Sequence, residues 1–162
     1  MSDKTDFADL EMDGGVISTP AFAMTDGVIQ GFGTLIADVT TYSNTDIHLA
    51  ATHNLTIVGN VNMTGGSVQW SLTSEDGITV MCGQININGT IHKAQFALTF
   101  VLDQYLPLPA HYVPLVRFTN NTVNMSDLNS LPTSAYANSL VFAITSNDIS
   151  FMWLPFTPPV RT

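Results

Sequence analysis

Charge is scarce in this sequence. Only 10% of the 162 residues are charged, and the only basic ones are Lys4, Lys93, Arg117 and Arg161. Nucleic-acid binding needs clustered Lys and Arg to neutralise phosphates, so the sequence predicts no nucleic-acid partner. With a net charge of −9, attachment to an anionic membrane surface is disfavoured for the same reason.

Cysteine and long apolar runs are also scarce. Cys82 is the only cysteine, so no intramolecular disulfide can form, and we expect its thiol to lie buried and inert in a strand. No apolar run is long enough to span a bilayer, and we find no secretory signal. The sequence therefore predicts no membrane insertion.

No segment carries an apolar stripe at helical spacing over eleven or more residues. Apolar residues instead alternate with polar ones, as at Phe96, Leu98, Phe100 and Leu102, which is the two-residue period of a strand with one buried face. About nine short strands separated by turn signals predict an all-β fold. The expected architecture is an antiparallel β-sandwich of the jelly-roll kind.

Residues 55–82 predict a three-stranded antiparallel meander. A two-residue turn at 65–66 would pair Met63 with Val68 and Val61 with Trp70, so Trp70 is expected in the core. A second turn at 75–77 would pair Leu72 with Val80. These pairings place the apolar side chains on one face of the sheet.

The apolar residues change from odd to even positions between Gln84 and Leu102, and this stretch has two interpretations. Asn88-Gly89 is a strong hairpin signal, but a hairpin there would set Ile91 opposite Asn86, on the wrong face. We therefore favour one long strand with a bulge near Lys93.

We divide the chain into an acidic N-terminal arm at 1–15, a β-sandwich domain at 16–154 and a proline-rich tail at 155–162. Within the domain, 15–27 is expected to be loop, and 42–53 a loop with a short strand at 47–49. A hairpin with its turn at 147–148 would close the sheet by pairing Ile144 with Phe151.

One stretch resembles a known class of proteins. A strand with an internal glycine leads into Leu108–Pro114, which reads LPAHYVP, and then into the closing hairpin. This pattern is similar to the C-terminal head domains of bacteriophage tail fibres and receptor-binding proteins. The resemblance implies a phage virion protein with other virion proteins as partners, made in the host cytoplasm, most simply as a homotrimer. A host-surface glycan is its candidate ligand.

Candidate site residues fall into two groups. The acidic arm is expected to act in assembly, through Asp3, Asp6, Asp9, Glu11 and Asp13. A receptor or glycan site is expected where aromatic residues border the proline-rich crossing and the long polar loop after it, at Tyr105, Tyr112, Asp127, Asn129 and Tyr136.

We expect no catalytic residue, metal or cofactor. No nucleophile elbow is present, and His48 and His53 are five residues apart, which places them on opposite faces of a strand. The alternatives to a fibre head are a capsid decoration protein and, from a different class, a lectin-like carbohydrate-binding domain.

Overall fold

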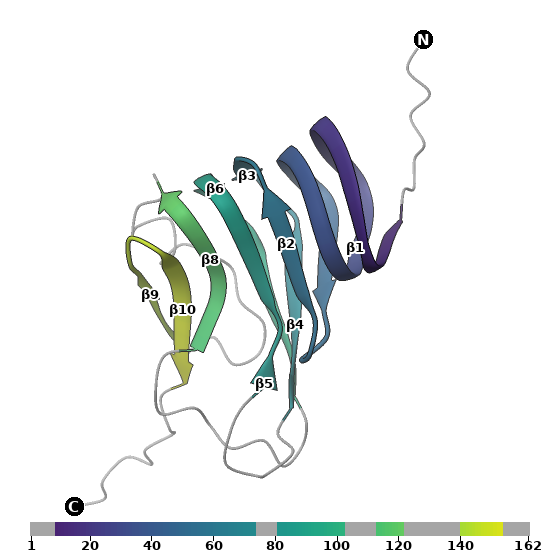
Figure 1. Cartoon of the computed structure of the whole chain (residues 1–162). Coiled ribbons are helices and arrows are strands. Elements are labelled where there is room, and N and C mark those ends of the chain that lie inside the picture. Colours follow the sequence, from purple (N-terminus) through teal and green to yellow (C-terminus); the bar gives the residue numbers. More distant parts are fainter. Residues whose placement is uncertain (1–8, 74–80, 103–112, 122–139, 154–162) are drawn as a thin grey trace, which may run out of the picture.

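The computed structural model describes residues 9–73, 81–102, 113–121 and 140–153, which contain strands and no helix (Figure 1). The strands are β1 (Leu10–Leu49), β2 (Asn54–Val58), β3 (Val61–Met63), β4 (Ser67–Thr73), β5 (Met81–Cys82), β6 (Gln84–Ala94), β7 (Ala97–Leu102), β8 (Val113–Asn121), β9 (Leu140–Ile144) and β10 (Asp148–Trp153). The prediction of an all-β fold is confirmed.

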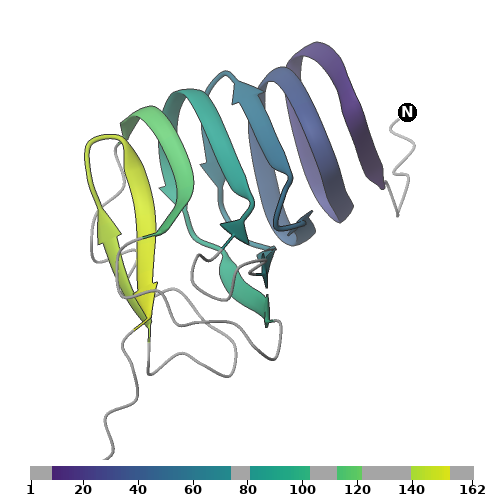
Figure 2. The ribbon, with the colours of Figure 1, turned by 60° about the horizontal axis from the view of Figure 1, so that its bottom comes forward.

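The chain winds into a stack of turns, each laid in parallel against the one before. Gly33 of β1 lies beside Leu55 of β2, Leu55 beside Ile85 of β6, and Ile85 beside Val116 of β8. β1 and β6 bend, and each also pairs in parallel with β3. The parallel pairings β1–β2, β2–β6, β6–β3 and β3–β1 therefore close into a ring. Figure 2 shows the turns side by side, with β1 and the β9–β10 hairpin at opposite ends.

β1 makes the first two turns by itself. The hydroxyl of Thr45 donates a hydrogen bond to the carbonyl of Met24, 21 residues earlier, at 2.6 Å. At the other corner, the turns approach so closely that a Cβ atom on Gly31, where φ is +96°, would lie 1.9 Å from the Met12 carbonyl oxygen. Residues 15–27 are therefore strand, and the prediction of a loop there is wrong. The prediction of a loop at 42–46 is wrong for the same reason, since β1 continues to Leu49. The described part of the acidic segment, residues 9–15, likewise enters β1 at Leu10.

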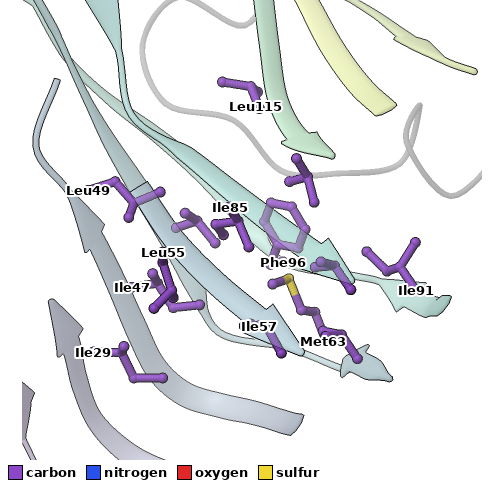
Figure 3. Packing of buried hydrophobic residues seen from close by; sticks show 14 of the residues in the cluster. Ile29, Ile47, Leu49, Leu55, Ile57, Met63, Ile85, Ile91, Phe96 and Leu115 are labelled. Atoms are coloured by element: carbon purple, nitrogen blue, oxygen red, sulfur yellow. The ribbon is translucent and has the colours of Figure 1, made fainter. Parts of the chain in front are cut away.

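The core is a set of columns that run along the stack. Leu35, Ile57, Ile87 and Phe118 are in-register partners from successive turns and are 0%, 1%, 2% and 4% exposed. Figure 3 shows such side chains packed between the strands that enclose them, Leu55, Ile57 and Ile85 among them. Trp70 is fully buried, which confirms its predicted core position; the side chain of Trp153 lies outside the described residues.

Polar side chains join successive turns at the corners. Asp38 accepts a hydrogen bond from the backbone N–H of Asn60 at 2.8 Å, and the Asn60 side chain accepts one from the N–H of Thr90 at 3.1 Å. Each turn thus supplies the acceptor for an amide of the next.

The predicted antiparallel jelly-roll sandwich is wrong for most of the sheet, because seven of the ten strand pairings between described elements are parallel. The predicted hairpin at residues 65–66 is a corner: β3 pairs with β1 and β6, and β4 with β1 and β7. The alternation of apolar and polar residues shows only which face of a strand is buried. A parallel strand with one solvent-exposed face alternates in the same way as an antiparallel strand, so the pattern does not distinguish the two.

Other predictions are confirmed in part. β6 runs as one strand through Asn88-Gly89, and the step from Val61↔Ile91 to Asn62↔Lys93 is the bulge expected near Lys93. The strand does not continue to Leu102 as predicted, because β6 ends at Ala94 and β7, which begins at Ala97, pairs with β4. β4 and β5 are antiparallel, as are β9 and β10, but both hairpins are shifted by two residues from the predicted register: Leu72 pairs with Cys82, and Ile144 with Ile149. A two-residue shift leaves every side chain on its original face, so the apolar pattern cannot detect it.

Candidate functional site

A polar groove of about 330 Å³ lies at the corner where β1 ends and the chain turns towards β2. Its side chains come from three successive turns of the stack. The lining includes Glu11 from the first turn, Gln30 and His48 from the second, His53 from the corner that follows, and Ser71 from β4 in the third turn.

Backbone contacts fix this corner. The N–H of His53 donates to the carbonyl of Ala50 at 3.0 Å, and the N–H of Gln84 donates to the carbonyl of His53 at 3.3 Å. A Cβ on Gly83 would lie 2.4 Å from the Ala50 carbonyl oxygen, so a larger residue there would push the next turn away. The side chains at the corner are therefore held on a rigid backbone.

An exposed aromatic ring adjoins the groove. The rings of Phe32 and His53 lie 4.7 Å apart, centroid to centroid, and are tilted by 43°. Phe32 is 38% exposed, and its other side lies over Gly14, where a Cβ would be 3.1 Å from the ring. The ring is thus seated between two neighbours while part of it faces solvent.

The prediction that His48 and His53 lie on opposite sides is wrong, because both line this groove. Side chains alternate between two faces only along an uninterrupted strand. Because β1 ends at Leu49, the corner between the two histidines breaks this alternation. Across the described residues, no cluster of three or more His, Cys, Asp or Glu side chains is placed to hold a metal ion.

A second, shallow groove of about 390 Å³ lies on another part of the outer surface, lined by residues that include Ser18, Pro20, Ile36, Asp38 and Val58. Ile36 is 39% exposed there. Val16, which is 66% exposed, lies two residues from Ser18. This part of the wall therefore carries large apolar side chains that face solvent.

Cys82 is a free, half-buried cysteine in β5. Its thiol donates a hydrogen bond to the carbonyl of Gly83 at 3.3 Å, and burial raises its pKa from 9.0 to about 12. A thiol that keeps its proton is a poor nucleophile.

The predicted receptor residues Tyr105, Tyr112, Asp127, Asn129 and Tyr136 all lie outside the described residues, as do Asp3 and Asp6 of the acidic group. Three acidic residues are placed. Asp9 accepts a hydrogen bond from the N–H of Val28 at 3.3 Å, Glu11 lines the polar groove, and Asp13 is exposed.

The reasoning from sequence missed Gln30, Phe32 and Ser71. The sequence around these three residues does not identify them as site residues. They come together at the groove only because the chain winds through one or two turns between them. The one available signal is the recurrence of glycines where turns touch, as at Gly31 and Gly83.

No helix among the described residues has the length and apolar character needed to cross a membrane. No protein-family model, no curated protein and no solved structure matches this chain.

Proposed function

We propose that this chain is a structural protein of a bacteriophage particle: a surface-exposed fibre head or knob that works by assembly, as a homotrimer together with other virion proteins, and not by catalysis. The observation that carries the proposal is the wound stack itself. A parallel pairing of strands turn upon turn, around continuous apolar columns, gives a stiff body suited to the display of a surface.

The composition of the outer wall supports this role. In-register outward positions carry uncharged polar side chains, as at Thr34, Thr56 and Asn86, which are neighbours along the stack. The wall also carries Ile36 and Val16, large apolar side chains that a subunit contact would cover. The resemblance of the 108–114 region to fibre heads points to the same class of protein.

The oligomeric state is the first test. Size-exclusion chromatography with light scattering is expected to give three times the 17.5 kDa chain mass, about 52 kDa. Ile36→Asp is expected to shift the protein towards monomer, because it places a charge on the apolar part of the wall. The matched control is Thr56→Asp, an outward change on a neighbouring strand. A wild-type monomer at all concentrations would contradict the assembly role.

The location is the second test. Antibodies against the chain, used on gradient-purified particles from the source culture, are expected to label the particle surface in electron micrographs. Label at fibre tips supports the head, and label spread over the shell supports decoration of the capsid. A chain that stays entirely with the unassembled protein fraction would overturn the proposal.

A further inference from the structure

The polar groove at the end of β1 combines two kinds of surface. Its side chains supply a carboxylate, an amide, two imidazoles and a hydroxyl, through Glu11, Gln30, His48, His53 and Ser71. Together these groups both donate and accept hydrogen bonds. Beside them stands the exposed ring of Phe32, which packs on His53.

These polar groups are available for a ligand. Among the described residues, no protein group forms a hydrogen bond with the side chain of Gln30, His48 or Ser71. The backbone beneath them is fixed by the corner hydrogen bonds and by the close approach of Gly83 to Ala50. A site whose side chains stand on rigid strands loses less entropy on binding than a site on a loop.

The charge of the groove narrows the ligand class. Its lining contains Glu11 and no Lys or Arg, and the whole chain carries a net charge of −9. Phosphates and acidic sugars would meet a carboxylate without a fixed cation to offset it. A neutral ligand with many hydroxyl groups meets no such repulsion.

We infer that this groove binds a neutral saccharide. The apolar C–H face of a sugar ring would lie on Phe32, and its hydroxyls would exchange hydrogen bonds with Gln30, His48 and Ser71. At about 330 Å³ the groove lies at the small end of ligand sites, which suits one or two sugar units. Saccharide binding by the groove needs only a single chain. The inference rests on the proposed function only for the particle on whose surface the groove would be displayed.

The groove can be tested by NMR titration of the isotope-labelled full chain. The probes are methyl glycosides of glucose, galactose and mannose, and N-acetylglucosamine. At least one is expected to shift the amide signals of residues around the groove, Gly31, Ala50 and His53 among them. If none of the four moves these signals at millimolar concentration, the inference is wrong.

Matched variants then locate the site. Phe32→Ala is expected to weaken the dissociation constant at least tenfold, and Ser71→Ala several-fold. The control is Tyr42→Ala, which removes a similarly exposed aromatic residue, 43% against 38% exposed, that does not line the groove. Tyr42→Ala is expected to leave binding unchanged. Equal loss in Phe32→Ala and Tyr42→Ala, with unchanged circular dichroism, would contradict the assignment.

Two further results separate this inference from the proposed function. If zinc shifts the ring signals of His48 and His53 and no saccharide changes the spectrum, the saccharide assignment is wrong. A trimer found on the particle would still support the virion role in that case. A chain that binds sugar through Phe32 but remains monomeric and never joins particles would support the groove and refute the virion role.

Discussion

The corner formed by Ala37, Gly59 and Gly89 gives the sharpest test of the wound stack. Gly59 has a φ of +151°, and a Cβ there would lie 2.0 Å from the Ala37 carbonyl oxygen of the preceding turn. A Cβ on Gly89 would lie 2.0 Å from the carbonyl oxygen of Gly59, without a positive φ. Replacement of either glycine by alanine therefore drives two turns apart, and only the change at Gly59 adds backbone strain.

The size of the effect follows from these contacts. Ordinary contact of a Cβ begins at 3.4 Å, so the turns must separate by about 1.4 Å at Gly59, where the N–H of Gly59 also donates to Asn88 at 3.1 Å. Loss of one or two such backbone hydrogen bonds costs about 1–3 kcal/mol, and an alanine at this φ adds about 1–3 kcal/mol. We expect Gly59→Ala to lower the free energy of unfolding by about 2–6 kcal/mol and Gly89→Ala by about 1–3 kcal/mol.

Urea titration followed by circular dichroism and by tryptophan fluorescence measures both changes. The control is Gly15→Ala, because a Cβ there would meet nothing within 4 Å, and we expect it to change the free energy of unfolding by less than about 0.5 kcal/mol. If Gly59→Ala is as stable as Gly15→Ala, the turns do not touch at this corner and the reasoning is refuted.

Three other outcomes follow from the winding. Ile57→Ala is expected to lower the free energy of unfolding by about 2–5 kcal/mol, and its outward neighbour Thr56→Ala by less than about 0.5 kcal/mol in the same titration; equal losses would contradict the assigned faces. At pH 8 the thiol of Cys82 is expected to react with a disulfide reagent far more slowly in the folded than in the urea-unfolded chain, because burial raises its pKa to about 12. The unfolded thiol loses its proton first, so the stability that this residue contributes is present below pH 9.0 and falls as the pH rises towards 12; equal reaction rates would argue against burial. Cysteines at Thr40 and Asn62, partners in adjacent parallel strands, are expected to cross-link on mild oxidation, as non-reducing electrophoresis would show, and an absence of cross-link counts against the parallel pairing.

The alternation of apolar residues identified the inward faces of β2 and β4 correctly. Leu55, Ile57 and Trp70 are buried as the period predicted, and the bulge near Lys93 followed from a change of phase in the sequence alone. These features depend on the geometry of one strand, whose side chains point to opposite faces in turn.

Which strands become neighbours was decided only by tertiary structure. Val61 was expected opposite Trp70, but lies between Val39 and Ile91 of the adjacent turns. The polar groove escaped the sequence for the same reason, since Glu11 and Ser71 meet only because the chain winds twice between them. Burial of one face of each strand decides which side chains point into the core. Long-range hydrogen bonding and packing between turns decide which strands lie next to one another.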